Sequence, residues 1–275
     1  MTIPAITFPA STLLFGAGKM GGAMLEGWLA QGLPPTSLTV IDPMPSGELK
    51  ALADQHGFAL NPANPKGPFA VIVLAIKPQM LEAAAPQLKG LYDASTLLVS
   101  VLAGKTMADL TNRLQGLMAV VRAMPNLPAS VGRGVTGAAA STAVSKEQRR
   151  LADTLLKGIG RVEWVEGENL IDAVTAVSGS GPAYVFHLVE CLAEAGVAEG
   201  LPRPVAERLA RATIEGAGEL LFRSDLSPEK LRQNVTSPGG TTAAALTVLM
   251  AADGLQPLMT KAVAAARRRA EELSG

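Results

Sequence analysis

The stretch LLFGAGKMGGAM, Leu13–Met24, decides the fold of the first part of the chain. An apolar run typical of a buried strand comes first, and Gly16, Gly18 and Gly21 follow in G-x-G-x-x-G spacing as a helical pattern begins. In this context the first glycine permits a tight turn, the second lets the backbone approach a pyrophosphate, and the third lets the helix pack closely on the strand. The helix start adds unpaired N–H groups for an anion. The stretch therefore predicts a dinucleotide-binding strand–loop–helix unit.

The same alternation of short apolar runs and helical segments continues through about the first 165 residues. The apolar runs are TLLF, SLTVID, FAVIVLA, TLLVSVLA and MAVVRAM, and segments such as GELKALADQH and MADLTNRL lie between them. Strands that alternate with helices indicate βαβ units and a mainly parallel sheet. GVTGAAA and RVEWV, on either side of the helical SKEQRRLADTLLKGI, are expected to extend this sheet. We therefore predict an α/β Rossmann-like domain over residues 1–165.

After Val165 the strand pattern stops, and helical segments broken by Gly and Pro fill the rest of the chain. Residues 166–275 are therefore predicted to form an all-α domain. The helix expected over 183–196 is apolar nearly all round, apart from a stripe of polar side chains. We expect this helix to be buried against a second copy of the chain, as a homodimer, and Cys191 on it to be a small buried hydrophobe.

The composition excludes several classes of protein. Lys plus Arg and Asp plus Glu balance at 24 each, so no global charge favours nucleic acid or an anionic membrane as a partner. A single cysteine excludes an intrachain disulfide and a Cys-based zinc site, and we expect no metal. The longest apolar run, residues 69–76, is too short to span a bilayer. The sequence MTIPAITFPA lacks the features of a secretory signal, and we expect a cytoplasmic location.

Asp42 ends the second predicted strand, 21 residues after Gly21. An acidic residue at this place usually accepts hydrogen bonds from the ribose hydroxyls of the adenosine, and it would repel a 2′-phosphate. No Lys or Arg follows closely, since the next residues are PMPSGE. This favours NADH over NADPH. The alternative is that Asp42 only caps the turn before Pro43.

Five motifs together resemble those of the pyrroline-5-carboxylate reductases, and the resemblance covers nearly the whole chain. They are GAGKMG (Gly16–Gly21), AIKP (Ala75–Pro78), RAMPN (Arg122–Asn126), SGSGPAY (Ser178–Tyr184) and SPGGTT (Ser237–Thr242). The resemblance implies a Rossmann-like domain, a helical dimerisation domain, a nicotinamide coenzyme and higher oligomers built from dimers. It also implies that the chain reduces Δ1-pyrroline-5-carboxylate to L-proline, the last step of proline synthesis.

The resemblance also implies which residues of this chain form the site. The coenzyme contacts are expected at Phe15, Gly16, Ala17, Gly18, Lys19, Met20, Asp42, Asn64, Ala75, Ile76, Lys77, Pro78 and Ala103. The substrate contacts are expected at Glu168, Asn234, Ser237, Gly239, Gly240, Thr241 and Thr242. Members of the family that favour NADP commonly carry small polar or basic residues where this chain has Asp42-Pro43. The choice between NADH and NADPH is therefore left open by the resemblance.

The substrate is a small ring with one carboxylate and one imine nitrogen. We expect the N–H groups of Gly239, Gly240 and Thr241, at a helix start, to hold the carboxylate. Thr242 is the candidate for assisting the imine nitrogen, and the alternative is an iminium formed in solution that needs no acid from the enzyme. For the SGSGPAY segment we favour a role in helix packing, with a share in shaping the pocket.

Three other functions remain alternatives at this stage. Two are enzymes that also join a Rossmann domain to a helical one, namely another imine reductase and a β-hydroxyacid dehydrogenase. The third is a coenzyme-binding regulator without catalysis. The SPGGTT loop argues against the two enzymes and weakens the regulator.

Overall fold

The computed structural model describes residues 7–274, which form two compact units. One unit contains the chain up to Gly179 and again from Ala266 onward, and the other contains Ser180–Ala265. The first unit contains all the described strands, and the second consists of helices. This confirms the predicted fold class, an α/β Rossmann-like part followed by an all-α part.

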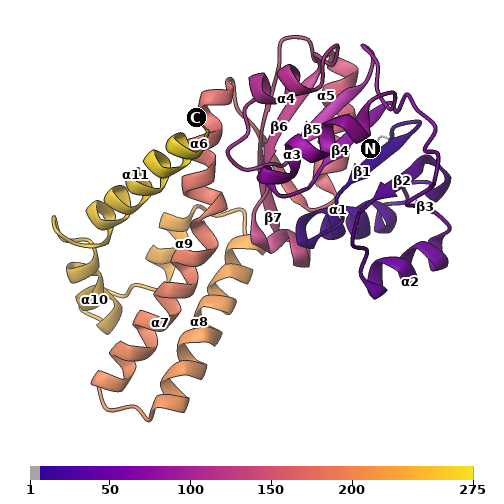
Figure 1. Ribbon diagram of the computed structural model, residues 1–275. Coiled ribbons are helices and arrows are strands. Elements are labelled where there is room, and N and C mark those ends of the chain that lie inside the picture. The colour runs from indigo at the N-terminus through magenta and orange to yellow at the C-terminus, as the bar shows by residue number, and fades with distance from the viewer. Residues whose placement is uncertain (1–6, 275) are drawn as a thin grey trace. The chain divides into compact units, whose positions relative to one another are not determined.

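The strands of the first unit form one sheet in the order β3-β2-β1-β4-β5-β6-β7-β8 (Figure 1). Their bounds are β1 (Thr12–Phe15), β2 (Leu38–Ile41), β3 (Ala59–Leu60), β4 (Val71–Leu74), β5 (Leu97–Ser100), β6 (Val120–Met124), β7 (Gly134–Ala140) and β8 (Gly160–Trp164). β7 is antiparallel to β6, and every other neighbouring pair is parallel. The predicted sheet, with its extension by GVTGAAA and RVEWV, is confirmed. β3 was not predicted, because a two-residue edge strand leaves no periodic pattern in the sequence.

Helices cover both faces of this sheet (Figure 1). They are α1 (Lys19–Ala30), α2 (Gly47–His56), α3 (Leu81–Ala84), α4 (Met107–Arg113), α5 (Lys146–Lys157) and α6 (Ile171–Val174). In β4, Val71 and Val73 pack with the apolar residues of α1, α2 and α5, whereas Ile72 and Leu74 pack with those of α3 and α4. Successive side chains of a strand point to opposite faces. A strand that is apolar at every position is therefore buried on both sides.

Glycines bring α1 close to its neighbours. A Cβ added to Gly21 would lie 2.1 Å from the carbonyl oxygen of Gly16, and one added to Gly27 would lie 2.1 Å from that of Gly158, at the end of α5. The indole Nε1–H of the buried Trp28 donates to the Leu155 carbonyl over 2.7 Å. The Gly21 contact holds the start of α1 against the loop after β1, as a binding loop at this place requires, and the other two contacts hold the end of α1 against α5.

The predicted domain bounds, 1–165 and 166–275, stay a prediction. The segment just after residue 165 contacts the sheet of the first unit. Ile171 in α6 is fully buried. The side chain of Val174 packs on Gly137 of β7, where an added Cβ would lie 2.4 Å from the Val174 Cγ1. This segment thus belongs to the same compact unit as the sheet.

The second unit contains α7 (Gly181–Ala198), α8 (Arg203–Arg223), α9 (Pro228–Asn234), α10 (Thr241–Leu249) and most of α11 (Leu255–Ser274). α7 packs along α8 through small residues, including the buried Ala193, Ala206 and Ala210. Large apolar side chains of α7 remain exposed, among them Phe186 at 55%. The expectation that Cys191 is buried is wrong for the single chain, where it is exposed. The reason is that no helix of its own unit covers this face of α7.

No helix among the described residues is both long enough and apolar enough to span a membrane.

Candidate active site

The loop after β1 and the start of α1 contain the three glycines of the motif. Close packing leaves no room for a side chain at Gly16 and Gly21, whereas Gly18 has open space around it. Gly16 has φ +94°, and a Cβ there would lie 2.8 Å from the Ala75 carbonyl oxygen. Gly21 has no room for a Cβ either. Gly18 has an ordinary φ of −66° and is exposed, and an added Cβ would meet no atom within 4 Å. The absence of a side chain at Gly18 therefore leaves open space beside the backbone, as a dinucleotide phosphate needs.

Strand pairing brings the ends of three strands to this loop. The Gly16 N–H donates to the Ile41 carbonyl at the end of β2, over 2.8 Å. The Ala75 N–H, just after β4, donates to the Phe15 carbonyl over 2.9 Å. β1 lies between β2 and β4, where the strand order reverses, and ligands of open α/β sheets bind at such a point.

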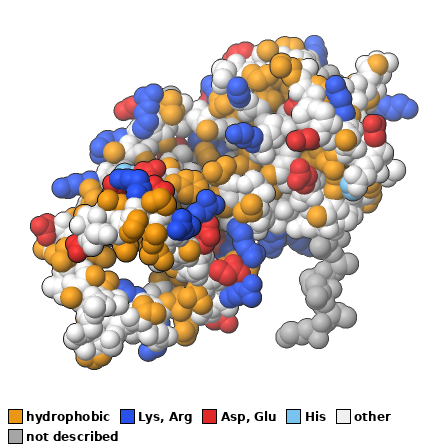
Figure 2. Space-filling model, turned by 90° about the horizontal axis from the view of Figure 1, so that it is seen from below, with side chains coloured by type: hydrophobic (Ala, Val, Ile, Leu, Met, Phe, Trp, Pro, Cys, Tyr) orange, Lys and Arg blue, Asp and Glu red, His pale blue; other side chains and the backbone are white. Residues whose placement is uncertain are grey.

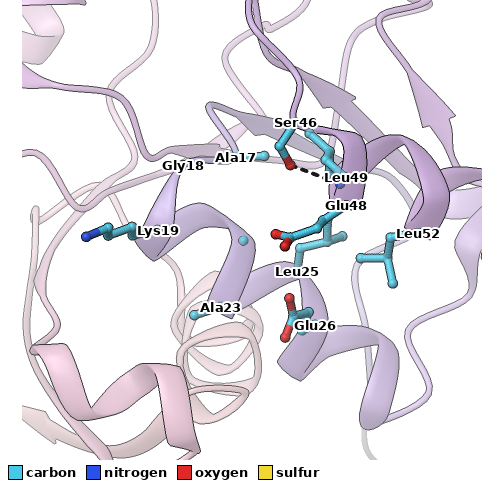
Figure 3. A pocket seen from close by; sticks show the side chains of 11 residues that line it. Ala17, Gly18, Lys19, Ala23, Leu25, Glu26, Ser46, Glu48, Leu49 and Leu52 are labelled. Carbon is cyan, nitrogen blue, oxygen red and sulfur yellow. Dashed lines mark hydrogen bonds between the residues drawn. The ribbon is translucent and has the colours of Figure 1, made fainter.

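The start of α1 is available to an anion. Its N-cap, Gly18, has no side chain to satisfy the first N–H groups, and the first turn contains no acidic residue. An open cavity of ≈ 510 Å³ lies beside it, between α1 and α2. Figure 3 shows Glu48 and Glu26 at this cavity, whereas the ammonium group of Lys19 points away from both. The cavity is thus lined by two carboxylates and by Lys19, whose ammonium group is not directed at them.

Asp42 contacts the glycine loop directly. Its Oδ2 accepts a hydrogen bond from the Ala17 N–H over 2.7 Å, and its Oδ1 accepts one from the Met44 N–H over 2.8 Å. The second bond is the turn cap that is the alternative role of Asp42, and the first joins the carboxylate to the glycine loop. One half-buried side chain therefore both caps its own turn and contacts the glycine loop, and its role toward a ribose stays a prediction.

Three other predicted coenzyme residues lie in the segments that follow β3, β4 and β5. Lys77 is exposed and precedes a short 3₁₀ turn that begins at Pro78, after β4. Ala103 is exposed after β5, the neighbour of β4. Asn64 is exposed in the segment between β3 and β4. Their roles toward a coenzyme stay predictions.

The SPGGTT loop forms a second uncapped helix start, within the other unit. Gly239 has φ +71°, and the Gly240 N–H closes a turn onto the Ser237 carbonyl over 3.1 Å. Gly240 is the N-cap of α10 and offers no side-chain cap, so the first N–H groups of α10 have no partner in the helix. A Cβ on Gly240 would lie 2.4 Å from the Ser237 Oγ. Thr242, in the first turn, is half-buried, and Asn234 is the exposed last residue of α9.

Glu168 lies in the first unit, where it is held by two donors. Its Oε1 accepts hydrogen bonds from the Met107 N–H over 2.6 Å and from an Arg122 Nη over 3.2 Å. The Arg122 side chain is only 3% exposed and also pairs with Asp172 over 3.4 Å. The Ser274 hydroxyl lies within hydrogen-bond distance of both Arg122 and Asp172. A fixed carboxylate is thus present where the resemblance expects a substrate contact.

Sequence reasoning gave no role to Arg122 or Asn126, although it singled out the RAMPN motif. In the sequence, Arg122 is the one charged residue of an otherwise apolar strand, and a buried arginine is almost always paired with an acidic residue. This pattern could have predicted its ion pairs. The side chain of Asn126 donates to the Ser178 carbonyl over 3.1 Å and accepts from the Val135 N–H over 2.9 Å. It thereby joins β7 to the SGSGPAY segment.

Within the single chain, close packing does not explain the glycines of SGSGPAY. Thr175–Gly179 forms a π-helical turn that leads into α7 without a loop. A Cβ on Gly179 would meet its nearest atom at 3.6 Å, and one on Gly181 would meet none within 4 Å. Close helix packing within the chain therefore does not require these glycines. A π turn is instead typical of functional sites in helices.

Comparison with known proteins matches both parts of the chain. A family described as pyrroline-5-carboxylate reductase dimerisation matches residues 168–273, and one described as NADP oxidoreductase, coenzyme F420-dependent, matches residues 12–104. The pyrroline-5-carboxylate reductase of Pseudomonas aeruginosa is 37% identical over 276 residues, which cover 100% of this chain and 98% of that one. The enzyme of Pisum sativum is 36% identical over the full length of both.

Two solved structures are similar over nearly the whole chain. A pyrroline-5-carboxylate reductase from Coxiella burnetii has a TM-score of 0.88 and 35% identity, covering 97% of this chain and 99% of that one. The pyrroline carboxylate reductase of Plasmodium falciparum, with NADP bound, has a TM-score of 0.75 and 26% identity, covering 97% and 98%.

Proposed function

The chain belongs to the pyrroline-5-carboxylate reductase family, and on that premise we propose how its residues reduce Δ1-pyrroline-5-carboxylate to L-proline with NAD(P)H. The observation that carries the proposal is the pair of glycine loops, each leading into a helix without a side-chain cap, α1 and α10. Such helix starts bind anions. The reaction needs two anion sites, one for the coenzyme pyrophosphate and one for the substrate carboxylate.

The residues of the first loop fit a dinucleotide. The open space at Gly18 accepts a phosphate, and the N–H groups at the start of α1 donate to it. Phe15 to Met20, with the segments after β2, β4 and β5, form the proposed contact surface. When bound, the nicotinamide supplies the hydride, and the protein binds, orients and excludes water.

We propose that this chain prefers NADH, although NADP is bound in the relative from Plasmodium falciparum. The Asp42 carboxylate, joined to Ala17, would accept hydrogen bonds from the ribose hydroxyls and repel a 2′-phosphate. Glu26 and Glu48 add negative charge at the neighbouring cavity, and the ammonium group of Lys19, which also lines the cavity, points away from both carboxylates. A 2′-phosphate would therefore be repelled by the carboxylate of Asp42 and by those at the cavity.

The second loop is proposed to hold the substrate carboxylate. The left-handed Gly239 and the N-cap Gly240 leave the N–H groups of the first turn of α10 unpaired. Hydrogen bonds from such groups to a carboxylate are charge-assisted and contribute about 1.5–3 kcal/mol each. Ser237 and Asn234, in the same unit, complete the contacts proposed for this loop, and Glu168 of the other unit stays a predicted substrate contact.

Thr242 is the proposed catalytic residue. As the hydride forms a bond to C5, the C=N π electrons would move onto the ring nitrogen, which takes up a proton from solvent to give the amine. The hydroxyl of Thr242, in the first turn of α10, would donate a hydrogen bond to that nitrogen. In the alternative, the imine is protonated to the iminium in solution before it binds, and Thr242 would then be dispensable. A kinetic comparison of variants separates the two routes.

The test is Thr242→Ala, with Thr247→Ala as the matched control on the exposed face of the same helix. We expect the Thr242 variant to lose at least about tenfold in kcat/KM for pyrroline-5-carboxylate, equivalent to ~1.4 kcal/mol. The coenzyme Kd should stay unchanged, and the Thr247 variant should behave as wild type. Unchanged kinetics in the Thr242 variant would remove this residue from the mechanism.

The exposed apolar face of α7 is proposed as the homodimer interface, consistent with the match of residues 168–273 to the dimerisation family. Assembly of dimers into a higher oligomer and a cytoplasmic location stay predictions.

A further inference from the structure

Asn61 has an unusual backbone conformation next to the proposed coenzyme site. Among residues 7–274 it is the one non-glycine residue with a clearly positive φ, +48°. It directly follows β3, at the edge of the sheet beside β2. Asn tolerates this left-handed region better than most residues, because its short amide side chain can bond to nearby backbone.

The side chain of Asn61 bonds to both backbone groups of Asp42. Its Oδ1 accepts from the Asp42 N–H over 2.9 Å, and its Nδ2 donates to the Asp42 carbonyl over 2.8 Å. The Asn61 N–H itself donates to the Val40 carbonyl over 2.9 Å. The last backbone pair of the ladder is Val40 with Leu60. The amide of Asn61 thus extends the β2–β3 pairing by one step, onto Asp42.

These two hydrogen bonds hold the backbone of Asp42, whose carboxylate is proposed to select the coenzyme. The Asp42 side chain then reaches the Ala17 N–H on one oxygen and the Met44 N–H on the other. A carboxylate has about four acceptor sites, so about two remain for a ligand. The direction of these two acceptor sites depends on the position of the Asp42 backbone, which Asn61 holds.

We propose that Asn61 is a positioning residue for coenzyme choice, which acts by holding Asp42 in place for the ribose hydroxyls of NADH. This inference rests on the proposed preference for NADH. Without the amide, the segment Asp42–Met44 loses its attachment to β3, and the carboxylate is no longer held at one place. Both the favourable contact with the ribose and the repulsion of a 2′-phosphate then weaken.

The test compares two substitutions that remove the same hydrogen bonds but differ in backbone strain. Glycine adopts φ +48° freely, whereas alanine does so at a cost. The Kd of NADH and of NADPH is measured for wild type, Asn61→Gly, Asn61→Ala, Asp42→Ser and the double variant Asp42→Ser/Asn61→Gly. Coenzyme fluorescence or calorimetry gives these constants without turnover, and thermal unfolding is recorded for each protein.

We expect Asn61→Gly and Asn61→Ala to lower the preference for NADH by the same factor, about fivefold, as for the loss of an ordinary hydrogen bond. Because both variants lose the same hydrogen bonds, the alanine variant should unfold at a lower temperature than the glycine variant by the cost of its backbone strain alone. In the Asp42→Ser background, Asn61→Gly should leave the ratio of the two constants unchanged, because the residue acts through Asp42.

Three other results would contradict the role proposed for Asn61 or the one proposed for Asp42. If Asp42→Ser shifts the ratio and Asn61→Gly does not, the inference about Asn61 is wrong while the role of Asp42 stands. If both coenzymes lose affinity equally, or the shift follows the loss of stability, Asn61 is only structural. If Asp42→Ser leaves the ratio unchanged, the proposed NADH preference through Asp42 fails, and the role of Asn61 fails with it.

Discussion

Replacing Gly18 by alanine is expected to separate the fold of the first unit from its binding of the coenzyme. The added Cβ would meet no protein atom within 4 Å, and the dihedral angles of Gly18, φ −66° and ψ −163°, are allowed to alanine. The methyl group would occupy the open space where the proposed phosphate lies. The substitution therefore reduces the space for the coenzyme phosphate without disturbing the packing of the protein.

The expected change in stability is small because two effects oppose each other. Alanine restricts the unfolded chain, which stabilises the fold by about 0.4–1 kcal/mol at an unstrained position. Alanine is also a poorer N-cap than glycine, and this costs about 0.5 kcal/mol. The net change lies within about 0.5 kcal/mol, which shifts Tm by less than about 2 °C in a chain of this size.

The expected change in binding is larger. A methyl group between the backbone and a phosphate lengthens charge-assisted hydrogen bonds that are worth about 1.5–3 kcal/mol each. Losing even one at the lower end raises the coenzyme Kd about tenfold. The Kd is measured by titrating the protein into NADH and following coenzyme fluorescence, and Tm is measured on the same samples.

Two neighbouring glycines provide the controls. In Gly22→Ala the new Cβ would lie 3.6 Å from the Ala17 carbonyl oxygen, an ordinary contact, so both Kd and Tm should stay near wild type. In Gly21→Ala it would lie 2.1 Å from the Gly16 carbonyl oxygen, so the variant should be destabilised by about 1–3 kcal/mol. A Gly18 variant with wild-type Kd and Tm would refute the placement of the phosphate at Gly18.

Two further predictions concern the buried ion pair and the exposed helix face. Arg122→Met leaves two carboxylates without their buried partner and should cost about 3 kcal/mol in urea unfolding, at the low end for buried pairs because Glu168 is 28% exposed. The same change at Arg113, whose ion pairs lie at the surface, should cost less than about 1 kcal/mol, and equal costs would contradict this account. Phe186→Asp places a charge on the proposed dimer interface and should give folded monomers in sedimentation, since Phe186 is 55% exposed in the single chain. A dimer of wild-type strength would show that the interface lies elsewhere.

Much of the fold was predictable because its signals are local in the sequence. The apolar run of β4, the glycine spacing from Gly16 to Gly21 and the Gly239–Gly240 break each describe the conformation of a few consecutive residues. Hydrophobic periodicity and turn residues report such local conformation directly. The α/β part, the all-α part and the glycine loops before α1 and α10 follow from these signals.

The contacts that complete the site join residues far apart in the sequence, and only the tertiary structure decided them. Asn61 bonds to Asp42 across 19 residues, and Arg122 bonds to Glu168 across 46. A side chain that pairs across such distances leaves no periodic pattern, because its partner is chosen by the packing of other elements. The sequence by itself therefore determined which segments are strands, helices and binding loops, and the tertiary structure determined which side chains hold those loops in place.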